Sequence, residues 1–440
     1  MIFPRAALIT VVVALGMALS TAQTTSSQST VRHHRVAEAE DAAYSSEIAS
    51  AEQAMANKDF ATAEKTLVAV TGKDPKNYRA WFDLGFVYNA TNRAPQAIDA
   101  YRKSVAANPQ IFESTLNLGI VLARAGDPDA EKVLRDATRL KPSAHQEEGW
   151  YRAWLTLGHV LEKSKPQEAV EAFQNAAKLN PKEAEPHLSA GLALEALKQY
   201  PQAAAEYRKA AELDPKSSEA LAGLVNAYSQ SGQYSEAETP LRKFIALDPS
   251  NATAHIQLGR LLASQKKWDD ATAEIEQGLK LQPGDVDAER QLATIYLNQK
   301  QFDAAIPHIE AALKTAPQDA ELHHWLGQAL LAQKRFPEAQ KELITALKLK
   351  PDIGEAYGDL AFAAQANQNY VLVIQALDAR AKFLPDVAMT CFLRATAYDH
   401  LHDAKQAATN YHKFLNMAEG RFPDEEWKAR HRLIAIEPKK

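Results

Sequence analysis

A short run near the C-terminus carries residue types that bind metals. Asp399, His400, His402 and Asp403 place two carboxylates and two imidazoles within five residues. A structural zinc needs four well-spaced ligands that can surround it as a tetrahedron. These four are crowded together and fall, by the periodicity described below, in a loop between two helices, where polar side chains are ordinarily solvated. We therefore expect no metal site here and no resident cofactor in the protein.

The motifs that carry common catalytic chemistry are absent from the chain. It contains no H-E-x-x-H, no G-x-x-x-x-G-K-[ST], no C-x-x-C and no G-x-S-x-G. These patterns are typical of metalloproteases, nucleotide hydrolases, thiol redox proteins and esterases. The single cysteine, Cys391, cannot form an intramolecular disulfide and is predicted to be a small buried residue. We predict that the protein is not an enzyme.

The composition favours helices and leaves no electrostatic footprint for nucleic acid. Only 17 of the 440 residues are Gly, while Ala, Leu, Gln, Glu and Lys, which lose little rotamer freedom in a helix, are abundant. Lys plus Arg number 50 against 55 Asp plus Glu, a net charge of -5 without a basic patch. A chain this long must divide into several domains or extend as a repeat array. We expect no nucleic-acid partner.

The first 22 residues have the three parts of a secretory signal. Arg5 precedes an apolar run of 14 residues, Ala6–Leu19, and small residues lead to a cleavage point after Ala22. Because a membrane-spanning helix needs roughly 20 apolar residues, we expect export to the periplasm or secretion, with no membrane insertion after cleavage. An uncleaved N-terminal membrane anchor is the alternative. Residues 23–43 are expected to be a flexible tether and the start of the first helix.

Prolines recur through the chain at a nearly constant interval. Seven of nine successive intervals are 34 residues, and the other two are 33 and 39, for the prolines Pro75, Pro109, Pro142, Pro181, Pro215, Pro249, Pro283, Pro317, Pro351 and Pro385. Proline lacks an amide donor and restricts the preceding residue, so each one is suited to end a helix. A period of this length predicts a repeat array.

The residues within each period resemble the tetratricopeptide repeat, whose pattern is W-x2-L-G-x2-Y, then A-x3-F, then P. One full match consists of Trp81, Leu84, Gly85, Tyr88, Ala97, Tyr101 and Pro109. The resemblance implies an all-α protein, an α-solenoid that winds as a right-handed superhelix of about eleven helix-turn-helix repeats. It covers about five-sixths of the chain.

Glycines recur at one position of the first helix in each repeat. We number the positions of each repeat so that this glycine stands at phase 8, which is occupied by Gly85, Gly119, Gly158, Gly191, Gly259 and Gly327. Glycine inside a helix costs about 0.5 to 1 kcal/mol relative to alanine. Its recurrence therefore predicts a close helix crossing at each of these residues.

The repeats divide the chain as follows. Repeats 1–3 are expected at 44–142 and repeats 4–11 at 151–419, separated by an insertion at 143–150. The insertion is interpreted as a tolerated loop, with an extended helix or a small binding element as alternatives. A further helix within 420–440 is expected to cover the end of the array with Trp427 and Ile434 on one face.

The resemblance also implies where a partner binds. In the family, first helices line the concave groove, and phases 2, 5, 9 and 12 are expected to face it. The predicted partner-binding residues at these phases are Phe82, Phe86, Asn89, Leu116, Ile120, Asn226, Arg260, Arg290, His324 and Gln328. Four of the first five, all but Asn89, make one half of the groove apolar, and the last five make the other half polar and locally basic. The alternative for the apolar members is that they form core between repeats.

These features predict a non-catalytic scaffold that binds a partner protein or peptide in the concave groove of the array. Apolar groups of the partner are expected on Phe82 and Phe86, and acidic groups on Arg260 and Arg290. Two alternatives stay open: an assembly subunit of a cell-envelope complex that uses its convex surface, and an enzyme with an unfamiliar active site in the groove.

Overall fold

The computed structural model describes residues 45–437 as 23 α-helices, with no strand in this part of the chain. The predicted all-α fold is confirmed. The predicted signal at 1–22 and the tether at 23–43 lie outside the described residues. Within the described part, no helix combines the length and apolar character needed to cross a membrane.

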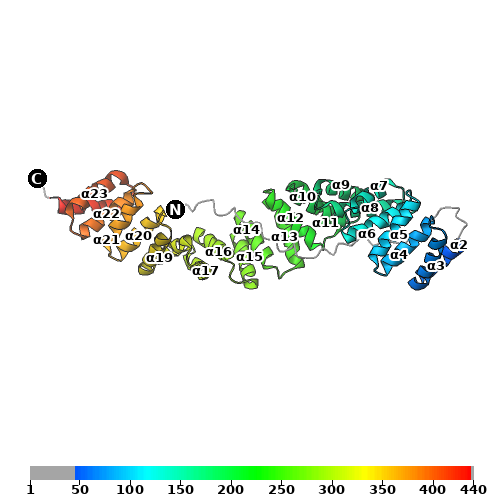
Figure 1. The fold of residues 1–440 in the computed structure, drawn as a ribbon. Coiled ribbons are helices and arrows are strands. Elements are labelled where there is room, and N and C mark those ends of the chain that lie inside the picture. Colours follow the sequence, from blue (N-terminus) through cyan, green and yellow to red (C-terminus); the bar gives the residue numbers. More distant parts are fainter. Residues whose placement is uncertain (1–44, 438–440) are drawn as a thin grey trace. The chain divides into compact units, whose positions relative to one another are not determined.

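The helices fall into two compact units divided after Pro249. The first unit contains six helix pairs in chain order (Figure 1). Its helices are α2 (Ser45–Ala56), α3 (Phe60–Lys73), α4 (Tyr78–Ala90), α5 (Ala94–Ala107), α6 (Phe112–Ala125), α7 (Ala130–Arg139), α8 (Gln146–Leu161), α9 (Pro166–Leu179), α10 (Glu185–Ala196), α11 (Tyr200–Leu213), α12 (Ser218–Gln230) and α13 (Tyr234–Leu247).

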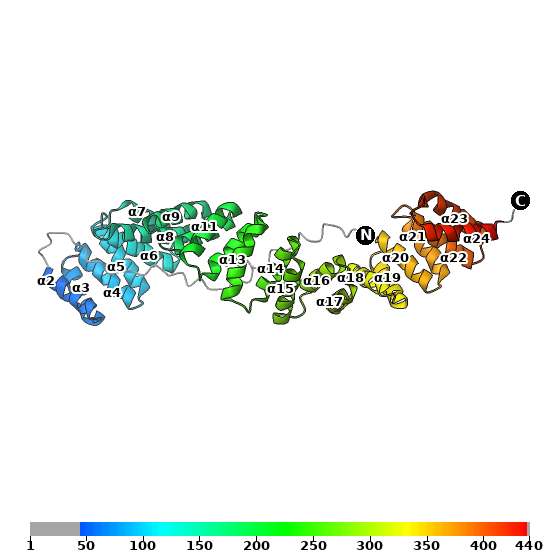
Figure 2. The ribbon, with the colours of Figure 1, turned by 180° about the vertical axis from the view of Figure 1, so that it is seen from behind.

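The second unit contains five more pairs and a terminal helix, again in chain order (Figure 2). Its helices are α14 (Ala252–Ser264), α15 (Trp268–Leu281), α16 (Val286–Asn298), α17 (Phe302–Thr315), α18 (Ala320–Ala332), α19 (Phe336–Leu349), α20 (Gly354–Ala366), α21 (Tyr370–Arg380), α22 (Ala388–His400), α23 (Ala404–Ala418) and α24 (Pro423–Ile436). The even-numbered helices from α2 to α22 are the first helices of their pairs. The right-handed winding of the array stays a prediction.

Local sequence explains where the helices begin and turn. Several first helices start at a polar N-cap whose side chain accepts a hydrogen bond from the backbone N–H three residues on, as Asn77 does from Ala80 and Asp285 does from Ala288. The turn inside most pairs contains a residue at phase 15 with positive φ, such as Lys198 at 58°. The left-handed conformation lets the chain reverse between the two helices.

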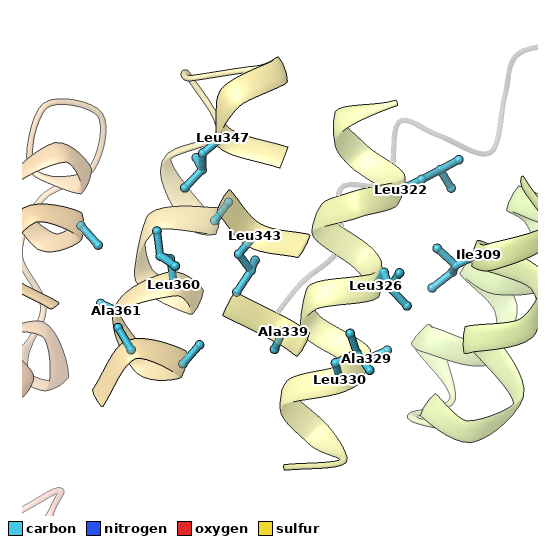
Figure 3. Close-up of a cluster of buried hydrophobic side chains, with 14 of the residues drawn as sticks. Ile309, Leu322, Leu326, Ala329, Leu330, Ala339, Leu343, Leu347, Leu360 and Ala361 are labelled. Carbon is cyan, nitrogen blue, oxygen red and sulfur yellow. The ribbon is translucent and has the colours of Figure 1, made fainter. Parts of the chain in front are cut away.

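Within each unit, every first helix after the leading one packs against its own second helix and against the second helix of the preceding pair. Figure 3 shows this for α18, where Leu322 and Leu326 lie beside Ile309 of α17 and Leu343 lies on the other side, on α19. All four side chains are buried in one hydrophobic cluster. Burying apolar surface at about 25 cal/mol per Å² makes this repeated contact the main stabilising term of the array.

The phase-8 glycines lie at close helix crossings, as predicted. A Cβ atom on Gly85 would lie 2.7 Å from the ring of Tyr101, and one on Gly119 would lie 2.6 Å from Leu134. The others meet the equivalent second-helix side chain: Phe173 for Gly158, Tyr207 for Gly191, Ile275 for Gly259 and Leu343 for Gly327. The glycines thus make room mainly for one large side chain of the second helix.

The insertion is partly helical and not simply a loop. Only residues 143–145 precede α8, and Gln146 begins a helix of 16 residues, whereas the other first helices have 12 to 14. The extended-helix alternative therefore describes residues 146–150.

The terminal helix α24 packs on the array with a different face from the one predicted. Ala429 and Leu433 are buried against the last pair, whereas Trp427 is 60% exposed and Ile434 is 70% exposed. Trp427 and Ile434 do lie on one face, but it is the outer face. The stripe from Glu426 through Ala429 to Leu433 has the helical spacing that covers the last pair.

Candidate functional site

The first helices of successive pairs approach one another and so form a row within each unit. Direct contacts link α2 with α4, α6 with α8 and α10 with α12 in the first unit, and α18 with α20 and α20 with α22 in the second. We call the side of this row that carries phases 9, 12 and 13 the first-helix face. Its phase-13 residues, such as Ala196 on α10 and Gln230 on α12, are exposed.

Three of the predicted apolar anchors cannot meet a partner, because they are buried. The exposed fractions are 1% for Phe82, 2% for Leu116 and 1% for Ile120. Phe86 and Asn89 are half-buried on the last turns of α4. The prediction of an apolar groove at these residues is corrected, and Phe82, Leu116 and Ile120 are core between repeats.

The segment 143–149, which we call the strap, helps to close the first-helix row at α6. Ser143 donates two hydrogen bonds to Oε1 of the buried Glu113, from its backbone N at 2.8 Å and from its Oγ at 2.6 Å. The space between the strap and α6 has a volume of about 10 Å³, close to that of one water. It is lined by Glu113, Leu116 and Asn117 of α6 and by Ala144, His145 and Glu148.

Two further contacts fix the strap and explain its sequence. Trp150 donates a 2.8 Å hydrogen bond from Nε1 to the carbonyl oxygen of Leu140. A Cβ on Gly149 would lie 2.9 Å from both Phe112 and Pro142, so a larger residue would push the strap away. The 39-residue proline interval therefore holds a packed element that occupies phases 2 and 5 of α6.

The arginines of the predicted basic half of the groove also interact with other residues of the chain. Arg290 pairs with Asp319 and lies 3.3 Å from Oε2 of Glu321, with its guanidinium 5.4 Å from the centre of the Trp325 ring. Arg260 is half-buried and interacts within the chain. The expectation that Arg290 is free to receive an acidic partner group is therefore wrong.

His324 and Gln328 meet at one carboxylate. His324 Nε2 lies 2.9 Å from Asp359 Oδ2, and Gln328 Nε2 donates to the same oxygen at 2.8 Å. Both residues link α18 to α20. One turn further along α20, Phe362 is 49% exposed and makes an edge contact with Phe336.

An open cleft lies on the first-helix face between α10 and α12. It has a volume of about 400 Å³, within the range of ligand sites. Leu192, which is 46% exposed at phase 9, lies in its lining. The complete lining is Leu192, Glu195, Ala196, Lys198, Tyr200, Asn226 and Gln230. Asn226 is thus a predicted site residue that the structure places in a cleft.

Glu195 is held in the wall of this cleft by two donors. Tyr207 donates from its hydroxyl to Oε2 at 2.7 Å, and Asn226 donates from Nδ2 to Oε1 at 2.5 Å. Burial, followed by the Glu195 charge, raises the pKa of Tyr207 well above its ordinary value, so the phenol stays protonated and keeps donating. Each carboxylate oxygen retains acceptor capacity toward the cleft.

Six of the cleft residues were missed as site residues from the sequence. Leu192 and Glu195 stand at the predicted phases 9 and 12, Ala196 and Gln230 stand at phase 13, Lys198 lies in the turn after α10, and Tyr200 begins α11. The residues at phase 13 do not distinguish this cleft, because α18 and α20 also carry alanine there, at Ala332 and Ala366. No pattern in the sequence singles it out.

His159, next along the row at phase 9 of α8, joins α8 to α10. Its Nδ1 lies 2.9 Å from Glu162 and its Nε2 lies 3.5 Å from Glu185. Burial of the ring disfavours the charged form, but these two carboxylates outweigh burial and raise the pKa of His159 to about 9. The imidazole is therefore positively charged at neutral pH, and its ion pair with Glu185 connects α8 with α10.

The run at 399–403 spans the end of α22 and the turn after it, so the predicted loop covers only residues 401–403. Asp399 binds Arg432 of α24 with distances of 2.6 and 2.7 Å, and His402 adopts the positive φ of phase 15. No cluster of three or more potential metal ligands is found in the part of the chain that the structure describes. Cys391 is buried, and burial raises the pKa of its thiol.

Two family models match the chain in agreement with this geometry. The model described as the Cilia and flagella-associated protein 70 C-terminal domain, a tetratricopeptide repeat domain, matches residues 148–369, which is half of the chain. A tetratricopeptide repeat model matches residues 48–110 and 90–145. The chain belongs to the tetratricopeptide repeat family. The matches end before the last pairs of this tetratricopeptide repeat protein, so the count of eleven family repeats stays a prediction.

Individual relatives are distant. Protein NPGR1 of Arabidopsis thaliana is 30% identical over 105 residues, which cover 23% of this chain and 14% of that protein. The solved structure of YrrB, a tetratricopeptide repeat protein with an unusual peptide-binding site, is 24% identical with a TM-score of 0.38 and covers 42% of this chain and 96% of its own. Yeast Tom70 is 15% identical with a TM-score of 0.31, covering 89% of this chain and 95% of its own.

Proposed function

We propose that this tetratricopeptide repeat protein is a non-catalytic scaffold that binds a segment of a partner protein on its first-helix face, at the cleft between α10 and α12. The observation that carries the proposal is the 46% exposed Leu192 inside a cleft of about 400 Å³. A cleft that combines an exposed aliphatic side chain with polar groups at its rim is suited to receive an apolar anchor of a partner.

The cleft suits protein binding better than catalysis. An active site needs ionisable groups that converge on a reacting atom and have shifted pKa values. Four tyrosines of the described residues, Tyr101, Tyr151, Tyr207 and Tyr411, have strongly raised pKa values, and burial is the largest cause for each. His159 has its raised pKa because it is held between two carboxylates.

A competition experiment tests the proposal. A displayed library of 12-residue peptides is panned on the full chain, and the enriched peptides are measured against two variants. Leu192→Gln removes the apolar anchor and should weaken binding by tenfold or more, since a buried anchor contributes about 2 kcal/mol at a hot spot. Lys209→Ala, at an exposed residue of the second helix α11, should change nothing. Binding that is lost with Lys209→Ala but not with Leu192→Gln would support the convex-assembly alternative instead.

We further propose that the protein is exported and cleaved after Ala22. The support is the charged start, the 14-residue apolar run and the small residues in the sequence. Mass spectrometry of the mature N-terminus should find Gln23 or a close neighbour. Recovery of intact Met1 in a membrane fraction would favour the uncleaved anchor.

A further inference from the structure

We infer that the cleft between α10 and α12 selects a segment with an aliphatic side chain next to a basic one, and that Glu195 is the residue that sets this preference. The inference rests on the proposed function and adds the chemistry of the partner. The partner charge is opposite to the one predicted from the sequence, which placed acidic partner groups on Arg260 and Arg290.

The charges on the two helices that form the cleft all have one sign. Helices α10 and α12 carry Glu185, Glu195 and Glu219, and neither helix contains Lys or Arg. Glu185 faces His159, whereas Glu195 lies in the cleft lining itself. A wall with fixed negative charge attracts a positive group and repels a negative one.

Glu195 can distinguish positive from negative ligand groups because its carboxylate is held in a fixed orientation. The hydrogen bonds from Tyr207 and Asn226 fix both oxygens, and Glu195 is half-buried. A fixed, partly desolvated charge interacts more strongly with a ligand than an exposed one, which water and salt screen. The neighbouring Leu192 supplies the contact for an aliphatic side chain.

Lys198 is the cationic residue in the cleft lining, and its position makes it the weaker determinant. It lies in the turn after α10 and is exposed, whereas Glu195 is anchored. Its flexible ammonium is screened by solvent and can move aside. Replacing it with alanine should therefore raise the affinity for a basic segment modestly, by about twofold.

The test compares three fluorescent 10-residue peptides that share a central leucine and differ only at the next two positions, which are both lysine, both glutamine or both glutamate. Binding to the full chain is measured at low salt. The lysine peptide should bind about tenfold more tightly than the glutamine peptide, and the glutamate peptide should bind most weakly. Raising the salt concentration should reduce this spread.

Two matched variants assign the effect to one carboxylate. Glu195→Gln keeps the size of the side chain and should remove most of the preference for lysine, about five- to tenfold in affinity. Glu212→Gln removes an exposed carboxylate of the second helix α11 and should leave the preference intact. Equal effects of the two variants, or tighter binding of the glutamate peptide, would overturn the inference.

The same peptides separate failure of the inference from failure of the proposed function. If Leu192→Gln abolishes binding of all three peptides while Glu195→Gln has no effect, the cleft is the site but Glu195 does not select its ligand. If Leu192→Gln leaves every affinity unchanged, the proposed site itself is wrong.

Discussion

Helices α6 and α10 occupy equivalent places in two repeats of the same unit, yet one is closed and the other is open. At phase 9, Ile120 of α6 is 1% exposed, whereas Leu192 of α10 is 46% exposed. The strap follows the pair that α6 begins and packs on phases 2 and 5 of α6, whereas no such insertion follows the pair that α10 begins. The same phase can therefore be buried in one repeat and exposed in another, and a connection between pairs, such as the strap over Leu116, is one cause of such differences.

The largest expected difference is in folding stability. Ile120→Ala should destabilise the first unit by about 2 to 5 kcal/mol, because it leaves a cavity in a packed core. Leu192→Ala should cost less than about 1 kcal/mol, because the side chain is already half in water. Hydrogen exchange of α6 and α10 amides measures both effects. Similar loss of hydrogen-exchange protection in the two variants would show that Ile120 and Leu192 contribute equally to stability.

The hydrogen bonds that hold the strap on α6 can be tested separately. Glu113→Ala removes the acceptor for both donors of the exposed Ser143, and a typical intramolecular hydrogen bond contributes about 0.5 to 1.5 kcal/mol. We expect faster hydrogen exchange in residues 143–149. Glu171→Ala, at an exposed residue of α9, is the matched control and should leave the strap protected. An unchanged strap in Glu113→Ala would mean that packing alone holds it.

The histidine between the closed and open regions predicts a smaller, pH-dependent effect. The folded pKa of His159 is about 9, above the value of about 6.5 for an unfolded chain. Its contribution is therefore fully present below pH 6.5 and is lost as the pH rises through 9, with a magnitude of about 1 to 2 kcal/mol. The thermal midpoint of the protein should fall more over this range than that of His159→Gln. Equal changes of the thermal midpoint with pH in the two proteins would show that the His159 ion pairs do not stabilise the fold.

The sequence predicts the fold well because the fold depends on short-range repetition. Gly85 and Tyr101 lie 16 residues apart in one repeat, so their contact is encoded by a spacing that recurs. The terminal helix was less predictable, because Trp427 and Ile434 form one apolar stripe and Ala429 and Leu433 form another. Which stripe faces inward depends on how α24 meets the last pair.

The site was predicted less completely, for a related reason. The exposure of Leu116 depends on the strap 30 residues away in the chain, and the availability of Arg290 depends on Asp319 in the next repeat. The position of a residue within its repeat predicts neither of these contacts. Asn226 was found because nothing covers the equivalent surface of α12, where the cleft remains open.

Site-directed crosslinking locates the bound peptide without removing the Leu192 anchor. A benzophenone maleimide is attached to Gln230→Cys, at an exposed residue of the cleft lining, or to Lys209→Cys on the second helix α11, and each labelled chain is irradiated with a biotinylated peptide enriched by panning. Buried Cys391 should contribute little background labelling. We expect a crosslinked product from residue 230 that unlabelled peptide competes away, and little product from residue 209. A competed product from residue 209 with none from residue 230 would contradict the proposed binding site.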